Sequence, residues 1–153
     1  MLKWFRQESP SAVAEVGDIT IARPWARIGT RRAGVVGGYL AITNRGSTAD
    51  RLSSAASPAA ETVEIHAIKV VGAVIRVRPL PDGLPIPADS TIELRPRGYH
   101  LQLRGLKQPP ALGTELPLTL VFERAGRADL KLRVEDSGLV GGDILDEEAH
   151  RDG

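Results

Sequence analysis

Two histidines are the residues in this chain whose type and placement could support metal chemistry. His66 lies in the segment EIHAI (64–68) and His100 in the segment GYHLQL (98–103), and both segments alternate as β-strands do. Neutral imidazole is a common metal ligand, and ligands that are distant in sequence converge when strands pair. The pattern predicts a metal site built across two strands. Ordinary surface or structural histidines are the alternative.

Other side chains for soft-metal or nucleophilic chemistry are scarce. The chain holds three histidines, no cysteine and no methionine beyond Met1, which excludes thiolate catalysis, disulfides and cysteine-based zinc or iron–sulfur sites. It contains no Gly-x-Ser-x-Gly, no phosphate-cradling loop and no His-Glu-x-x-His motif. We therefore expect a protein without enzymatic activity.

Composition indicates one soluble domain. The chain has 153 residues, 42% of them hydrophobic and 25% charged, which is ordinary for a globular domain. No apolar run reaches the ~20 residues needed to cross a bilayer, and no export signal opens the chain. Positive charges are scattered and only six residues are aromatic, so we expect no nucleic-acid partner.

The elements that must position the histidines are short strands. Apolar residues repeat at period two, with turn signals between the repeats, which predicts an all-β, antiparallel Greek-key sandwich or barrel. We expect a flexible lead-in over residues 1–17, a folded domain over 18–134 and an acidic flexible tail over 135–153. The expected strands lie at 19–21, 39–42, 63–65, 74–77, 92–94, 101–103, 116–122 and 130–134.

Alternation also assigns the faces of the histidine strands. It places His66 opposite Ile65 and His100 opposite Leu101, so both imidazoles are expected to lie off the main core. Glu64 shares the face of His66. We expect its carboxylate either to orient the imidazole through a hydrogen bond or to form a plain surface ion pair.

Short motifs follow one another in a fixed order along the chain. They are IARPWAR (21–27), GYLAITN (38–44), DRL (50–52), SPAA (57–60), EIH (64–66), RP (78–79), GYH (98–100) and GLK (105–107). In this order the motifs resemble the PCu(A)C family of bacterial periplasmic copper chaperones. The resemblance implies a cupredoxin-like fold that binds Cu(I) and hands it towards assembly of the cytochrome oxidase copper centre.

The metal-site pattern of that family is only half present. His66 and His100 match its histidines, whereas Val77 and Gln102 stand where the family has methionines. Cu(I) is soft and favours sulfur, so loss of both thioethers should weaken its binding. Two imidazoles with the Gln102 amide oxygen would better suit Cu(II) or Zn²⁺.

Two further expectations concern the surroundings of this site. Arg76 and Arg78 flank position 77 and should add positive charge that disfavours a cation. Trp25 could shield a metal or present a contact surface, but an aromatic residue in an early strand is more often part of the core. We expect Trp25 in the core.

These observations predict a monomeric carrier of copper or a related metal. His66, His100 and Gln102 are the expected ligands at the domain surface, and a recipient protein is the expected partner. The alternative is a metal-independent β-sandwich interaction module that has lost the copper site. The resemblance implies a periplasmic location, and the absence of a signal peptide from this chain leaves a cytoplasmic one as the alternative.

Overall fold

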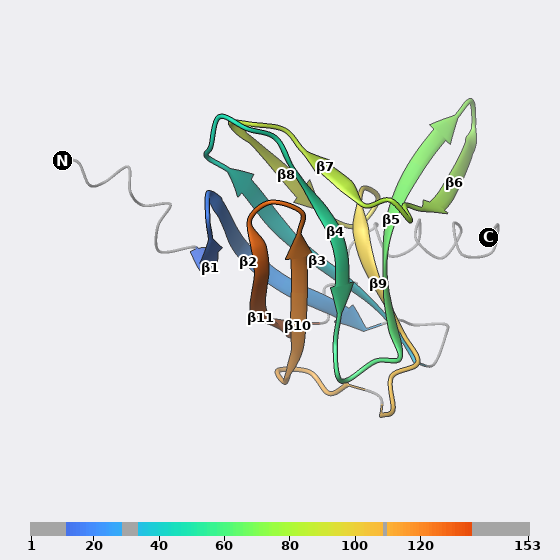
Figure 1. Ribbon diagram of the computed structural model, residues 1–153. Helices are drawn as coiled ribbons and strands as arrows, with labels where there is room; N and C mark the ends of the chain where they lie inside the picture. The colour runs from blue at the N-terminus through green and yellow to red at the C-terminus, as the bar shows by residue number, and fades with distance from the viewer. Residues whose placement is uncertain (1–11, 29–33, 109, 136–153) are drawn as a thin grey trace.

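The computed structural model describes residues 12–28, 34–108 and 110–135, and in these ranges the chain forms strands and turns (Figure 1). None of the described residues belongs to a helix long and apolar enough to cross a bilayer. The strands are β1 (Ala12–Val16), β2 (Ile19–Ile28), β3 (Val35–Asn44), β4 (Asp50–Ala56), β5 (Thr62–Val71), β6 (Val74–Pro79), β7 (Leu84–Ile86), β8 (Ser90–Leu94), β9 (His100–Arg104), β10 (Glu115–Phe122) and β11 (Gly126–Glu135).

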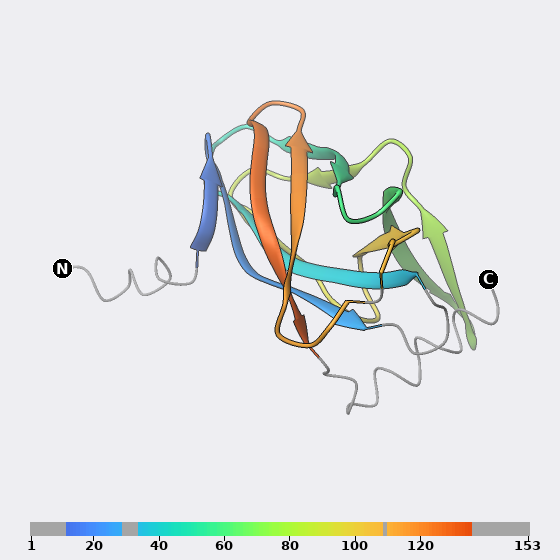
Figure 2. The same cartoon turned by 90° about the horizontal axis from the view of Figure 1, so that it is seen from below.

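The strands close into a barrel. Along the sheet the order is β1-β2-β11-β10-β4-β5-β9-β3-β8, and an additional pairing of β2 with β3 joins the two sides (Figures 1 and 2). Every pairing is antiparallel except that of β11 with β2. Closure satisfies backbone groups that an open sheet would leave at its edges. The predicted all-β, antiparallel architecture is confirmed, with the β11–β2 pairing as a parallel addition.

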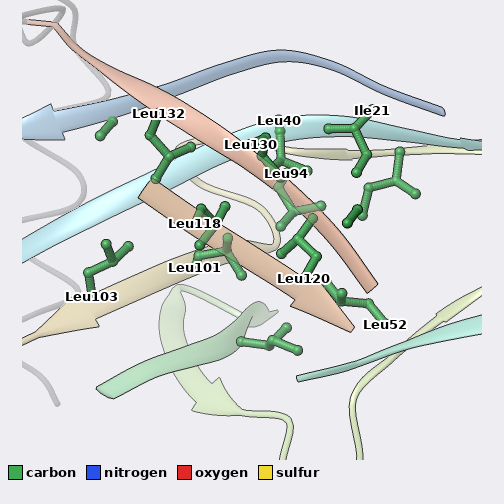
Figure 3. Packing of buried hydrophobic residues seen from close by; sticks show 14 of the residues in the cluster. Ile21, Leu40, Leu52, Leu94, Leu101, Leu103, Leu118, Leu120, Leu130 and Leu132 are labelled. Atoms are coloured by element: carbon green, nitrogen blue, oxygen red, sulfur yellow. The ribbon is translucent and has the colours of Figure 1, made fainter. Parts of the chain in front are cut away.

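The barrel interior is filled by aliphatic side chains from alternate positions of its strands (Figure 3). On β9 and β10, for example, Leu101, Leu103, Leu118 and Leu120 are all at most 1% exposed. Fully burying a leucine or isoleucine contributes about 1.5–3 kcal/mol. The core therefore holds the strands in one register, and that register fixes where the residues on the outer faces lie.

Three strands were missing from the sequence prediction. Residues 12–16, which we expected in the lead-in, form β1 and pair with β2. β4 and β7 pair with each other, although neither segment 50–56 nor segment 84–86 shows a clear alternation. Residues 1–11 of the lead-in and residues 136–153 of the acidic tail lie outside the described residues.

The β5–β6 hairpin extends past the barrel wall (Figures 1 and 2). Its register runs from His66 opposite Pro79 to Val71 opposite Val74. The turn contains Gly72 at a φ of +63°, a left-handed conformation that glycine adopts at low cost. The first residue of this register, His66, is also where the hairpin meets β9.

Candidate metal centre

The two histidines of the sequence analysis meet. His66 on β5 lies directly opposite His100 on β9 in the antiparallel register. Their ring centroids are 5.4 Å apart, and the rings are inclined at 67°. Metal-to-imidazole nitrogen bonds are about 2.0–2.1 Å long, so two rings at this separation fit on either side of one ion. The prediction that these residues come together across strands is confirmed.

The histidines lie outside the aliphatic core, as alternation predicted, but they are less accessible than expected. The His66 side chain is only 6% exposed, while His100 is partly buried. The expectation of a site at the open surface is therefore wrong for His66. Its face of the sheet carries a second, polar layer of side chains that covers the ring.

A carboxylate fixes the tautomer of His66. The Nε2 atom lies 2.8 Å from Oε1 of Glu64. Because an ionised carboxylate only accepts hydrogen bonds, Nε2 is the nitrogen that carries the proton, and Nδ1 keeps the lone pair. Nδ1 is buried and has no hydrogen-bond partner among the described residues. The expected orientation of the His66 imidazole by Glu64 is confirmed.

A backbone carbonyl fixes the tautomer of His100 in the same way. Its Nδ1 lies 2.9 Å from the carbonyl oxygen of Gly98, so Nδ1 donates and the lone pair lies on Nε2. Metal-binding histidines usually donate their second ring N–H to a carboxylate or a carbonyl. Both imidazoles of this pair are held in that manner.

Glu64 is kept ionised by its neighbours. The hydrogen bond from His66 is the main cause of its lowered pKa, which partial burial opposes and the positive charge of Arg104 reinforces. The Arg104 Nε atom lies 3.6 Å from Oε1 of Glu64. The carboxylate is thus shared between an imidazole and a guanidinium, and it can hold His66 in one orientation.

Gln102 occupies the next position of the same layer. It lies opposite Glu64, is 5% exposed, and its Oε1 accepts a hydrogen bond of 3.2 Å from Nη2 of Arg104. The oxygen that we expected to face a metal is therefore bound to a cation. Alternation puts Arg104 on this face, but one sequence cannot show that its guanidinium reaches both Glu64 and Gln102.

Val77 and its two flanking arginines lie on opposite faces of the hairpin. Val77 is opposite Ile68, which shares the face of His66, whereas Arg78 is opposite Ala67. Arg76 and Arg78 therefore lie on the face of the hairpin opposite to the histidines. Residues adjacent in a strand point to opposite sides of the sheet. Arg104 is the cation that lies beside the histidines.

An aromatic cluster continues the outer layer on β2 and β3. Trp25 lies opposite Tyr39 with ring centroids 4.6 Å apart, and the Arg27 guanidinium donates a 3.3 Å hydrogen bond to the Tyr39 hydroxyl. A side chain at Gly37 would collide with that hydroxyl. The expectation of Trp25 in the core is wrong, because Trp25 is partly exposed on the outer face.

The donor set available to a metal is small. Among residues 12–28, 34–108 and 110–135, no group of three or more His, Cys, Asp or Glu side chains is arranged to hold a metal ion. The site therefore consists of two imidazoles with defined lone pairs, next to a carboxylate already bound to one of them. Such a pair can bind an ion that accepts two nitrogen ligands and takes its remaining ligands from elsewhere.

Comparison with known proteins places this chain in a family. Residues 19–134 match the family described as "Putative lipoprotein LpqE-like". "Putative lipoprotein Lxx21020" of Leifsonia xyli subsp. xyli is 26% identical over 118 residues, which make up 77% of this chain and 70% of that protein.

Those structures share the fold. The copper-bound PCuAC domain from PmoF2 is 27% identical, with a TM-score of 0.68 over 80% of this chain and 96% of that one. The Cu(I) form of DR1885 from Deinococcus radiodurans has a TM-score of 0.60 at 22% identity, over 86% of this chain and 85% of that one. The resemblance to PCu(A)C proteins is confirmed, and the chain belongs to the LpqE-like family.

Proposed function

We propose that this protein binds one ion of copper, or of a related metal, between His66 and His100 and delivers it to a recipient protein. The proposal is carried by one observation, that the two facing rings are held in the same way. Each ring has one nitrogen held by an acceptor, Glu64 for His66 and the Gly98 carbonyl for His100. The ligand atoms are then Nδ1 of His66 and Nε2 of His100.

The surrounding residues bear on which metal is preferred. Val77 and Gln102 take the places of the two methionines, so the described residues offer nitrogen and oxygen but no thioether. Such a donor set favours Cu(II) or Zn²⁺ over Cu(I). Gln102 can serve as a third, weaker ligand if its oxygen turns from Arg104 to the ion.

The proposed role is that of a carrier with no reaction of its own. Two protein ligands, or three with Gln102, leave positions on the ion through which ligands of a recipient can enter. The solved relative named as a copper-bound PCuAC domain supports copper as the cargo. By the family resemblance, the recipient belongs to assembly of the cytochrome oxidase copper centre.

The proposed setting is outside the cytoplasmic membrane, in the periplasm or its equivalent. The matching family and the curated relative are both named as lipoproteins, which supports an extracytoplasmic site. Fractionation of cells that express the native gene, followed by immunoblotting, tests this setting. Recovery in the cytoplasmic fraction alone would contradict it.

A chelator-competition titration tests the metal proposal. Cu(I) is titrated anaerobically, and Cu(II) and Zn²⁺ in parallel, into the wild type and the His66→Ala/His100→Ala double variant. We expect one equivalent to bind the wild type and binding to be lost in the double variant. Because His66 is buried, the single variant His100→Ala and a thermal melt of each protein separate loss of ligands from loss of fold.

The third histidine of the chain provides a matched control. His150→Ala removes an imidazole that is not one of the two proposed ligands and should leave the titrations unchanged. A wild type that binds none of the three ions, or a double variant that binds as the wild type does, would overturn the proposal.

A second function is favoured by one observation. The Arg104 guanidinium lies against Glu64 and Gln102, and a fixed positive charge beside the histidines opposes cation binding. A protein that had lost its copper site would retain the fold as a metal-independent interaction module. Partner capture that is unchanged by the His66→Ala/His100→Ala substitutions, together with absence of metal binding, would favour this function.

A further inference from the structure

Part of the β5–β6 hairpin pairs with no other strand of the described residues. β9 begins at His100, opposite His66, so within the described residues the part of β5 that follows His66 pairs only with β6. In two views at right angles the hairpin stands away from the barrel (Figures 1 and 2). The tip of the hairpin can therefore contact a surface outside the domain.

The tip is apolar and exposed. Val70, Val71 and Val74 are 63%, 52% and 47% exposed, and the turn between them consists of Gly72 and Ala73, which are also exposed. Five consecutive apolar residues at the end of a projecting hairpin contribute nothing to the core of the barrel. Solvated apolar residues gathered at one point indicate an interaction site.

A cluster of cations follows directly behind the tip. Lys69 lies opposite Arg76, and Arg78 is two residues further along the same face of β6. Like charges directly opposite in a sheet destabilise the pair. Within the described ranges, none of the three side chains forms an ion pair with a carboxylate. Local conflicts of this kind are expected at functional sites, and a cluster of cations suits an anionic partner.

The spacing of tip and cations matches a bilayer surface. At about 3.3 Å per residue, the Lys69–Arg76 pair lies about 7 Å behind the Val71–Val74 pair. Elements that lie in a membrane interface bury their apolar residues about 5–10 Å into the boundary between headgroups and acyl chains. Cations at that depth reach the lipid phosphates, where each contributes about 1 kcal/mol, or roughly fivefold in affinity.

We propose that the tip of the β5–β6 hairpin, residues 69–78, docks on an anionic lipid bilayer. The valines enter the interface and Lys69, Arg76 and Arg78 contact phosphates. A stable protein interface needs about 800 Å² from each partner, which is more than a narrow tip of three valines offers. Three valines followed by three cations suit the surface of a membrane instead. His66 is five residues from Val71, so the histidine pair would remain about 17 Å from the tip, outside the bilayer.

Vesicle flotation tests the proposal with the full chain. Vesicles of phosphatidylcholine alone are compared with vesicles that also contain phosphatidylglycerol. We expect binding to the anionic vesicles, weakening as salt is raised. Lys69→Gln/Arg76→Gln should weaken that binding roughly 30-fold, at about fivefold per cation. Val70→Thr/Val71→Thr/Val74→Thr keeps β-branched side chains and should weaken it at least about tenfold.

A matched charge variant locates the contact. Arg124→Gln/Arg133→Gln removes the same charge from exposed positions elsewhere on the barrel and should bind anionic vesicles almost as the wild type does. Equal loss in this control would show that total charge, and not the hairpin, governs binding. Equal binding to both kinds of vesicle, or binding to neither, would overturn the proposal. The metal titrations are independent of all these outcomes.

Discussion

The two faces of strand β9 bury side chains of opposite character. Leu101 and Leu103 point into the barrel and have no exposed surface, whereas Gln102 between them is 5% exposed on the outer face. The inner face is stabilised by the burial of closely packed apolar side chains, where a cavity is costly. The outer face is held by hydrogen bonds around Glu64 and Arg104. One strand thus supplies both the stability of the fold and the polar layer that orients the histidines.

Truncation of the inner face should have the largest effect. Leu101→Ala removes a fully buried side chain next to His100 and should lower the free energy of unfolding by about 2–5 kcal/mol. Urea unfolding followed by circular dichroism measures this loss. A loss below about 1 kcal/mol would mean that the barrel interior at this point relaxes around the gap, and the contrast between the faces would fail.

Truncation on the outer face should change function instead of stability. His100→Ala removes one of two proposed ligands and should lower metal affinity more than about 100-fold, beyond the usual effect of a supporting residue. The free energy of unfolding should change by less than about 1 kcal/mol, because the ring is only partly buried. The two measurements on one variant are chelator competition and urea unfolding. Unchanged affinity would remove His100 from the site.

The carboxylate behind His66 should have a smaller effect on the metal. Glu64→Gln replaces a charged acceptor of the His66 N–H by a neutral one and should lower affinity by about 10- to 100-fold. Glu93→Gln is the matched control, since Glu93 pairs with Arg23 and Arg95 away from the histidines. If both variants bind alike, the orientation of His66 does not depend on the charge of Glu64.

Sulfur placed on the outer face should alter the preferred ion. Val77 shares the histidine face, and Gln102 lies beside the pair on the other side. Val77→Met/Gln102→Met should raise the preference for Cu(I) over Cu(II) roughly tenfold or more, which is about 1.4 kcal/mol. Anaerobic and aerobic titrations of the same variant measure the ratio. An unchanged ratio would mean that position 77 does not reach the ion.

Alternation was enough to predict most of the inner face. Period-two repeats located β9, β10 and β11 and put His66 and His100 on the face away from the core. It did not find β4, whose sequence DRLSSAA mixes small and polar residues and which becomes a strand through pairing with β5, β7 and β10. Long-range pairing of this kind leaves no local signal.

The outer face was harder to predict because its burial depends on contacts between strands. Alternation assigns Gln102 and Arg104 to one side, but it cannot show that a guanidinium covers the amide and the carboxylate of Glu64. Trp25 was misplaced for the same reason. An aromatic side chain suits the core by composition, and only the register with Tyr39 shows that the indole belongs to the outer layer.

The smallest expected effect concerns an exposed carboxylate on the outer surface of the barrel. On β10 and β11, Thr119 donates a 2.6 Å hydrogen bond to Asp129, and Arg127 donates to the same carboxylate. The Thr119 bond is the main reason that the pKa of Asp129 is lowered, with Arg127 adding to it. A lowered pKa in the folded state means that the ionised carboxylate stabilises the fold above the usual aspartate value of about 3.9. That contribution is lost as pH falls through the folded pKa.

The thermal midpoint of Asp129→Asn should therefore lie slightly below that of the wild type at neutral pH, and the gap between the two midpoints should close under acid conditions. A gap that stays constant with pH would mean that the exposed carboxylate of Asp129 adds nothing through its charge, in contrast to the Glu64 carboxylate that holds the buried ring of His66.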